Sequence, residues 1–244
     1  MTRHIRRAKI VLLASAKGGT TKTTSAVHIA YGLARFGFRV LLVDSDRQAS
    51  SYRWYEQLTP ADGSPSPAGF LVHRQTDPKM LRTEVVAFRD QYDFIVIDTP
   101  AITGTEGGAL VGRAAGLADH VIVPTAPAGT ETGTVDDSLR FIVQVNEMRE
   151  SAGMGTSDVR ILLTRMDYRT TAAKTGREAL ALHDVTVMTA EIPTRTEILT
   201  SFGQIPNPEF YEPVILELFG DDLAARAAEG ADEGHGDGSG DDAQ

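Results

Sequence analysis

The sequence predicts an α/β fold in which a doubly wound, mostly parallel sheet carries helices on both faces. Two observations predict it. Short apolar runs alternate along the chain with segments of helical periodicity, as they do where parallel strands are joined by crossover helices. Lysine, threonine and aspartate residues, which can bind phosphate or a metal ion, follow several of these runs. Ligands of such sheets bind at the carboxyl ends of the strands. We therefore expect one site at that edge of the sheet.

Each expected strand is a short apolar run rich in valine, isoleucine and leucine. The runs lie at residues 9–14, 39–43, 94–97, 120–123, 159–163 and 185–189. Expected helices between them include residues 27–36, 80–89, 132–150 and 174–182. Residues 59–69 are rich in proline and glycine and are expected to form a loop, not a domain boundary, because the alternation resumes after them.

Composition restricts the class of protein. The chain has 244 residues, enough for one large α/β domain, and its first strand starts within ten residues of Met1, so no helix-turn-helix domain is expected before it. It contains no cysteine, which excludes disulfides, thiolate metal sites and a cysteine nucleophile. No apolar run approaches the roughly 20 residues that span a bilayer, and we expect a cytoplasmic protein.

The acidic charge is concentrated at the C-terminus. The formal net charge is −9, but residues 221–244 hold eight acidic residues against Arg226, a balance of −7, which leaves −2 for residues 1–220. From Glu229 onward no large apolar residue occurs, so this segment cannot bury enough surface to order itself. We expect a folded domain over residues 1–228 and a disordered acidic tail over 229–244. The tail serves solubility or competes with nucleic acid for a basic face.

A glycine-bearing loop at residues 15–24 follows the first apolar run and precedes an amphipathic helix. Strand, loop and helix in this order form a phosphate site, because the loop's N–H groups surround phosphate oxygens and the helix N-terminus adds positive charge. Lys22 would reach the β- and γ-phosphates, and Thr23 would coordinate Mg²⁺. Residues expected to contact the nucleotide are Lys17, Gly18, Gly19, Thr20, Thr21, Lys22, Thr23 and Thr24. The alternative is a glycine-rich turn with two solvated lysines.

The loop departs from the usual pattern at both ends, where Ala16 and Thr21 stand in place of glycine. A threonine at position 21 must either accept a positive φ or shift the local backbone. The loop also gains a second lysine, Lys17, at its start.

The string Lys17-Gly-Gly-Thr-Thr-Lys-Thr-Thr24 resembles the deviant phosphate loop of the ParA/MinD ATPases, which are P-loop NTPases. In that family the early lysine crosses a dimer interface to touch the partner's nucleotide, so Lys17, Lys22 and Asp46 are the expected catalytic residues. The resemblance runs from about residue 9 to 220 and implies ATP and Mg²⁺ as cofactors and an ATP-driven homodimer. It is strongest to small ParA partition ATPases that lack an N-terminal helix-turn-helix domain.

Two aspartates, Asp44 and Asp46, end the second strand and can share one face. They resemble the family's Asp-x-Asp-Pro-Gln segment, with Arg47 in place of proline. The resemblance implies that Asp46 positions the attacking water and that Asp44 supports the Mg²⁺ shell; positioning is the main requirement of phosphoryl transfer. The alternative is a strand-ending pair that caps the next helix.

Asp98 ends the apolar strand before Thr99 and Pro100, as in a Walker B motif. It would hold a Mg²⁺-bound water opposite Thr23, because Mg²⁺ keeps several waters and takes few protein ligands. A strand followed by aspartate is common by itself, so the prediction depends on the ordered trio of loop, aspartate pair and Asp98.

The later strands are expected to supply the adenine site. By resemblance, Met166 in the segment 163–167 and Pro193 in the segment 190–197 contact the base, mostly through the main chain. The alternative for both is an ordinary loop residue.

Partners follow from charge and resemblance. Candidate DNA-phosphate contacts, clustered late in the sequence, are Arg165, Arg169, Lys174, Arg177 and Arg195; such contacts are sequence-independent. Membrane binding is not expected, because residues 209–220, where membrane-bound relatives carry an amphipathic helix, are short and acidic.

Three functions remain open. The first is a nucleoid-associated partition ATPase for plasmid or chromosomal DNA, whose slow hydrolysis a ParB-like centromere-binding partner stimulates. The second is a positioning ATPase for a protein cargo with its own adaptor. The third, prompted by Thr21, is a nucleotide switch that hydrolyses almost nothing.

Overall fold

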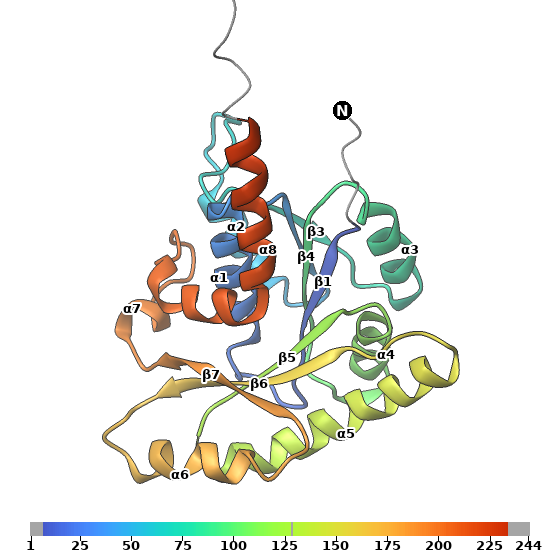
Figure 1. Ribbon diagram of the computed structural model, residues 1–244, viewed down its shortest axis with the longest axis vertical. Helices are drawn as coiled ribbons and strands as arrows, with labels where there is room; N and C mark the ends of the chain where they lie inside the picture. Colours follow the sequence, from blue (N-terminus) through green and yellow to red (C-terminus); the bar gives the residue numbers. More distant parts are fainter. Residues whose placement is uncertain (1–6, 128, 234–244) are drawn as a thin grey trace, which may run out of the picture.

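The computed structural model describes residues 7–127 and 129–233, and its centre is a sheet of seven parallel strands (Figure 1). The strand order is β3-β2-β4-β1-β5-β6-β7. The strands are β1 Lys9–Leu13, β2 Val40–Asp44, β3 Leu71–Arg74, β4 Phe94–Asp98, β5 His120–Thr125, β6 Asp158–Met166 and β7 Thr186–Pro193.

A helix lies in each connection between consecutive strands. They are α1 Lys22–Arg35, α2 Ser50–Leu58, α3 Pro78–Phe88, α4 Gly104–Ala115, α5 Gly129–Ser151, α6 Thr171–Leu180, α7 Thr196–Leu199 and α8 Glu212–Glu233, with a 3₁₀ turn at Pro208–Phe210 before α8.

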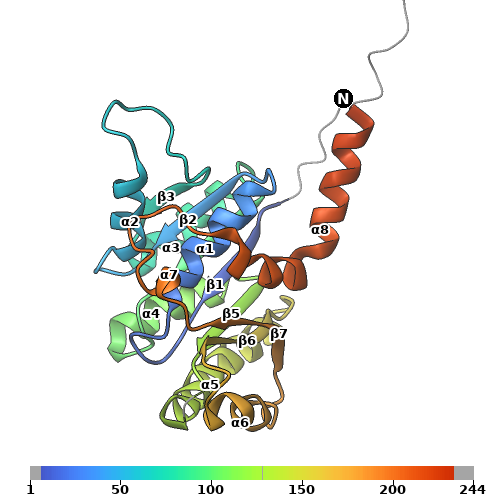
Figure 2. The same cartoon turned by 90° about the vertical axis from the view of Figure 1, so that its left-hand side faces the viewer.

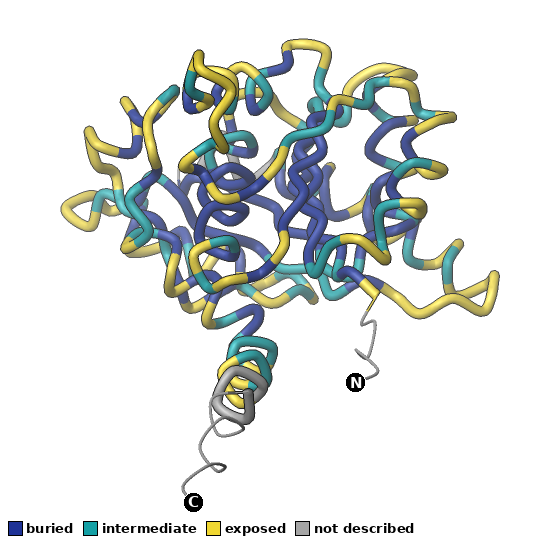
Figure 3. Tube along the Cα trace, turned by 90° about the horizontal axis from the view of Figure 1, so that it is seen from above, coloured by how far each residue is buried: buried dark blue, intermediate teal, exposed yellow. Residues whose placement is uncertain are grey.

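Alternating residues of the central strand face two separate cores. Val11 and Leu13 of β1 pack in one core with α1, α2 and α8, whereas Ile10 and Leu12 pack in the other with α3, α4, α5 and α6. Buried residues fill the interior of the molecule, and exposed ones lie on the outer turns (Figure 3). The predicted doubly wound sheet with helices on both faces is therefore confirmed.

All six predicted strands are present, and the structure adds a seventh. The extra strand, β3, lies at the edge of the sheet, where Leu71 is 54% exposed and the next residues include a histidine and an arginine. An edge strand needs no buried apolar run, so its sequence gives a weak signal. The helices α2 and α4 were also not predicted, since α2 is mostly polar and α4 contains several glycines.

The strand order brings the predicted motifs together. β1 lies between β4 and β5, with β2, β3 and β4 on one side of it and the later strands β5, β6 and β7 on the other. The loop that follows β1 lies at this switch in strand order. The carboxyl ends of β2, β4 and β1 are neighbours, with Asp44 in register with Asp98 and Asp98 in register with Leu13.

Helix α8 is broken at Phe219, whose φ of −134° and ψ of 19° are not helical. The Phe219 ring packs against Phe94 at 4.9 Å and His120 at 5.2 Å. Beyond this point α8 stands away from the body (Figures 1 and 2), anchored near its base by an ion pair between Lys9 and Asp222 at 2.6 Å. The domain boundary predicted after residue 228 falls inside this helix, and the rest of the predicted tail, residues 234–244, lies outside the described residues.

Candidate functional site

The loop between β1 and α1 is held from behind by its neighbours. The Ala16 amide donates to Ser138 Oγ of α5 at 2.8 Å, and the Ile102 amide donates to the Ser15 carbonyl at 3.0 Å. On the other side the loop is open: a Cβ at Gly18 or Gly19 would meet no atom within 4 Å. An open, glycine-lined backbone at a helix N-terminus suits phosphate.

Thr21 takes the first of the two predicted courses. Its φ is 64° and its ψ is 15°, so the threonine occupies the left-handed region and the loop backbone is not displaced to avoid it. Thr21 is also the residue from which α1 starts, because its carbonyl accepts the Ser25 amide at 2.8 Å.

Lys22 is 8% exposed and folds back onto its own loop, where its Nζ donates to the Lys17 carbonyl at 3.1 Å. Burial lowers the pKa of Lys22, while the charges of Asp98 and Asp46 act in the opposite direction. Both aspartates therefore lie close to this ammonium group. Lys17 is exposed at the outer side of the loop, as a lysine that reaches a second protomer must be.

Asp98 is fully buried, and neither of its carboxylate oxygens has a hydrogen-bond partner within the described residues. Burial, and then the charge of Asp44, raise the pKa of Asp98 to about 7, while Thr23 and Lys22 oppose the rise. A buried carboxylate with unused oxygens beside the Thr23 hydroxyl fits a group such as a hydrated Mg²⁺ ion. No cluster of three histidines, aspartates or glutamates suited to a metal occurs in the described ranges.

Asp44 bonds to the first turn of the next helix, as expected from the alternative in which the aspartate pair caps that helix. Its Oδ1 accepts the Asp46 amide at 3.0 Å, and its Oδ2 accepts the Tyr52 amide in the first turn of α2 at 2.9 Å. Burial raises its pKa, and these hydrogen bonds oppose the rise. Asp44 thus holds the start of α2, and its support of a Mg²⁺ shell stays a prediction.

Asp46 lies at the half-buried mouth of the site, two residues beyond the end of β2. Its Oδ1 accepts the Gln48 amide at 2.9 Å, an arrangement that fixes the carboxylate on its turn. Arg47, which replaces the family's proline, forms an ion pair with Glu106 of α4 at 2.5 Å. The role of Asp46 in orienting water is not tested by this geometry.

A small pocket of about 90 Å³ opens beside the phosphate loop, at the carboxyl ends of β6 and β7. Its lining residues are Thr21, Thr24, Thr164, Arg165, Ile192, Pro193, Thr194, Arg195, Ile198, Leu199 and Tyr211. The predicted Pro193 lines the pocket. Because the pocket adjoins the phosphate loop, it is the candidate site for the adenine of a nucleotide whose phosphates bind the loop.

The side chain of Met166 does not reach this pocket. It is 3% exposed and packs in the core with Ile161 and Leu163, while its carbonyl accepts the Thr194 amide at 2.9 Å. Simple strand alternation would have placed residue 165 in that core. The pairing of β6 with β7 shifts register between Leu163 and Met166, and Arg165 takes a φ of 53°, so Met166 turns inward and Arg165 lines the pocket.

The other predicted DNA contacts lie on α6 and in the segments that precede α6 and follow β7 (Figure 1). Arg169 pairs with Asp167 at 2.8 Å, and Arg177 pairs with Glu191 at 2.5 Å. Lys174 and Arg195 are exposed.

Several site residues were missed by sequence reasoning. Ser138 holds the loop backbone from α5, and Tyr211 lines the pocket while its hydroxyl lies 2.9 Å from Ser25 Oγ. Ser51 of α2 is buried beside Asp44 and Asp98. No sequence motif marks any of the three, because each reaches the site through tertiary packing.

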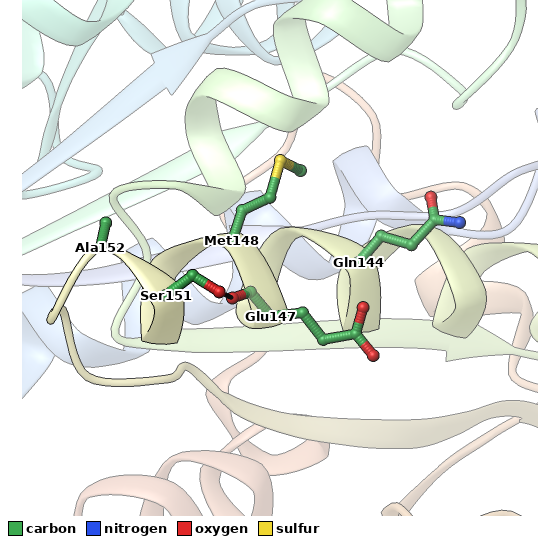
Figure 4. A pocket seen from close by; sticks show the side chains of 5 residues that line it. All are labelled: Gln144, Glu147, Met148, Ser151 and Ala152. Carbon is green, nitrogen blue, oxygen red and sulfur yellow. Dashed lines mark hydrogen bonds between the residues drawn. The ribbon is translucent and has the colours of Figure 1, made fainter.

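A larger hollow, of about 670 Å³, lies elsewhere. It is formed near the end of α5 by Gln144, Glu147, Met148, Ser151 and Ala152 (Figure 4). Because α5 starts at the carboxyl end of β5 and runs back, this hollow is at the opposite end of the sheet from the phosphate loop.

None of the described helices is long and apolar enough to cross a bilayer.

Comparison with known proteins agrees with this geometry. Residues 11–205 match the family model of the CobQ/CobB/MinD/ParA nucleotide binding domain. Over 161 residues the chain is 35% identical to the maintenance of carboxysome distribution protein A of Gloeobacter kilaueensis, a match that covers 66% of this chain and 65% of that protein, just under two thirds of its length. Over 204 residues it is 30% identical to the chromosome-partitioning ATPase Soj of Thermus thermophilus, covering 72% of this chain and 78% of that one.

A solved structure shares the fold. The septum site-determining protein MinD of Pyrococcus horikoshii, complexed with Mg-ADP, superposes with a TM-score of 0.62 at 22% identity, covering 94% of this chain and 98% of that chain. The prediction of a nucleotide ligand agrees with the matching family model, which is that of a nucleotide binding domain. The predicted resemblance is confirmed: this chain belongs to the CobQ/CobB/MinD/ParA family of nucleotide-binding domains.

Proposed function

We propose that this chain is an ATP-hydrolysing positioning protein of the ParA type. ATP and Mg²⁺ drive formation of a homodimer, the dimer binds DNA without sequence preference, and a ParB-like partner stimulates slow hydrolysis and releases it. The observation that carries the proposal is the buried Asp98 carboxylate at the end of β4, which has no hydrogen-bond partner among the described residues and is influenced by the charge of Lys22. A buried carboxylate of this kind is costly unless a bound ligand uses it.

The chain's own groups have separable tasks in this reaction. Lys22 neutralises charge on the β- and γ-phosphates, and the loop amides at Gly18 and Gly19 surround them. Mg²⁺, when bound, neutralises phosphate charge; Thr23 and Asp98 would hold it and its water shell. Asp46 accepts a hydrogen bond from the attacking water and aligns it.

Lys17 supplies the reason for a dimer. Its side chain is exposed, whereas Lys22 is buried in the same loop, so the two lysines cannot do the same work. A cation that reaches into the partner's site would offset repulsion between two facing triphosphates. This step makes dimer formation depend on ATP.

Support for DNA as the surface comes from the cations near α6 and β7 and from the name of the Thermus relative, a chromosome-partitioning ATPase. Lys174, Arg195 and Arg169 are exposed, and Arg177 is half-buried. Arg169 and Arg177 are already paired with carboxylates, so their exchange onto DNA phosphates would gain less.

A positioning ATPase for a protein cargo is the second candidate. The Gloeobacter relative is named for carboxysome distribution, and the pairing of Arg169 and Arg177 reduces the expected basic surface. The nucleotide chemistry is the same in both candidates, and only the cargo and its adaptor differ.

One pair of measurements on the full chain tests the proposal. Steady-state phosphate release is measured with ATP and Mg²⁺, with and without non-specific duplex DNA, and DNA binding is followed by anisotropy with ATP, ADP or no nucleotide. We expect slow hydrolysis and DNA binding that requires ATP. Equal DNA binding with ATP and ADP would contradict the nucleotide-gated DNA step, and absence of any hydrolysis would favour a nucleotide switch.

A further inference from the structure

Thr21 holds a backbone conformation that disfavours its own side chain. Its φ of 64° lies in the left-handed region, which glycine adopts freely and β-branched residues rarely adopt. The residue directly precedes Lys22 and starts α1, so its dihedral angles set the direction of both. A loop that relaxed at Thr21 would move the ammonium group and the helix N-terminus away from the phosphates.

A hydrogen-bond chain from the sheet holds Thr21 in place. The Thr21 Oγ1 lies 2.6 Å from the Thr20 carbonyl and 3.1 Å from Thr164 Oγ1, and Thr164 Oγ1 lies 3.2 Å from the Thr125 carbonyl. Each hydroxyl carries one proton, so Thr21 cannot donate to both of its neighbours. The two threonines are hydrogen-bonded when Thr21 donates to Thr164 and Thr164 donates to Thr125, or when Thr21 donates to Thr20 and Thr164 donates to Thr21. If both hydroxyls donated to the carbonyls of Thr20 and Thr125 instead, the two threonines would share no proton, and Thr164→Val would then leave Thr21 unaffected.

The position of Thr164 makes this bond rigid. Thr164 is fully buried in β6, and its neighbour Arg165 has the other strained backbone of the pocket, with a φ of 53°. Thr21 and Thr164 both line the pocket beside the loop. The hydroxyl pair therefore joins the phosphate end of the site to its base end.

We infer that Thr164 is a positioning residue for nucleotide binding, because its hydroxyl holds Thr21 in the left-handed conformation that the phosphate loop requires. The inference rests on the proposed nucleotide site. It has a specific consequence: Thr164 matters only while residue 21 carries a side chain that resists this conformation. Replacement of Thr21 by glycine, which needs no such restraint, makes the Thr164 hydroxyl dispensable.

The test is a double-mutant cycle on the full chain, read as the affinity for a fluorescent ATP analogue with Mg²⁺. The variants are Thr21→Gly, Thr164→Val and the double variant, with Thr164→Ser as the conservative rescue and Thr175→Val, on the exposed face of α6, as the matched control. We expect Thr164→Val to weaken binding about fivefold, the size of one neutral hydrogen bond. Thr164→Ser and Thr175→Val should bind as the wild type does, and the double variant should bind as Thr21→Gly does, within about twofold.

Each other outcome has a definite meaning. An equal loss from Thr164→Val in both backgrounds would show that Thr164 acts through general packing and would overturn the inference, as would no loss in the Thr21 background. Thermal unfolding without nucleotide identifies any variant whose loss comes from misfolding, and the comparison between backgrounds cancels a common destabilisation. If the wild-type chain failed to bind the analogue at all, the proposed function would fall together with this inference.

Discussion

The two sides of the nucleotide site are built on different principles. On the phosphate side, β2, β4 and β1 pair in unbroken register, so Asp44 lies opposite Asp98 and both are buried at the start of their loops. On the base side, β6 and β7 pair with register shifts, and Arg165 takes a positive φ. The sheet itself places the phosphate-side groups, whereas turns and individual hydrogen bonds place the base-side groups.

This difference predicts a gradient of mutational effects. Side chains on the phosphate side act directly on ligand charge, so their removal should abolish binding or turnover. Side chains on the base side act on backbone shape or on exposed surface, so their removal should change affinity by smaller factors.

The largest effect is expected for Lys22→Ala. It removes the buried ammonium group that faces the β- and γ-phosphates, and we expect Mg-ATP affinity to fall by roughly a hundredfold or more, as for loss of several charge-assisted hydrogen bonds. Isothermal titration calorimetry measures the affinity, with Lys79→Ala on the surface of α3 as the charge-matched control. Equal affinity in the Lys22 and Lys79 variants would remove the phosphate assignment.

Asp46→Ala should separate binding from catalysis. Loss of the water-orienting carboxylate should lower turnover by roughly a hundredfold, while ATP affinity and thermal stability stay near wild type. Asp44→Ala is the informative contrast, because it leaves the Tyr52 amide of α2 without its acceptor and should lower the melting temperature. An Asp46 variant that turns over ATP at the wild-type rate would make Asp46 a structural residue.

The contribution of Asp98 to the stability of the nucleotide-free protein should fall as pH rises from about 4 to about 7, because the pKa of Asp98 is raised from 3.8 to about 7 on folding. Over that range the folded state binds more protons than the unfolded state, so deprotonation favours unfolding. His28 acts in the opposite direction, since burial lowers its pKa to about 4 and stability gained from it rises with pH up to about 6.5.

Denaturant unfolding of wild type and Asp98→Asn at several pH values isolates the Asp98 effect, because His28 is common to both. The difference in unfolding free energy should shift in favour of the asparagine variant as pH rises. A difference that stays constant from pH 4 to 8 would mean that Asp98 titrates at the same pKa in both states.

The smallest effects are expected at the base-side surface. Lys174→Ala should weaken DNA binding a few-fold and lower the slope of log affinity against log salt by about 0.9, the value for one phosphate contact. Arg177→Ala should change the slope less, because Arg177 is already paired with Glu191 at 2.5 Å. Anisotropy titrations over a salt series test both, and unchanged slopes in both variants would favour a protein cargo.

The same contrast decides how much the sequence could predict. The roles of Lys22, Thr23 and Asp98 could be predicted because phosphate and Mg²⁺ sites demand particular side chains at strand ends, and parallel strands bring those ends together. These roles stay predictions. For Thr21 the sequence left two possibilities open, a positive φ or a shifted backbone, and the structure has the positive φ.

The base side was harder because its contacts depend on irregular backbone. Because of the register shift between Leu163 and Met166, Met166 faces the core instead of Arg165. The residue pattern of β6 does not predict this shift. Tyr211, which directly precedes α8, and Ser138 of α5 reach the site from segments far away in sequence. Asp44 carried an ambiguous signal, since a strand-ending aspartate can hold either a helix start or a metal shell.

The most direct test of the proposed ATP-gated dimer is its mass in solution, measured by size-exclusion chromatography with light scattering. With Mg²⁺ and a non-hydrolysable ATP analogue the wild type should be a dimer, and with ADP a monomer. Lys17→Ala should bind the analogue yet remain a monomer, because its exposed lysine is the group proposed to reach the partner's nucleotide. A dimer of Lys17→Ala equal to wild type, or the same wild-type mass with ATP analogue and ADP, would contradict the proposal.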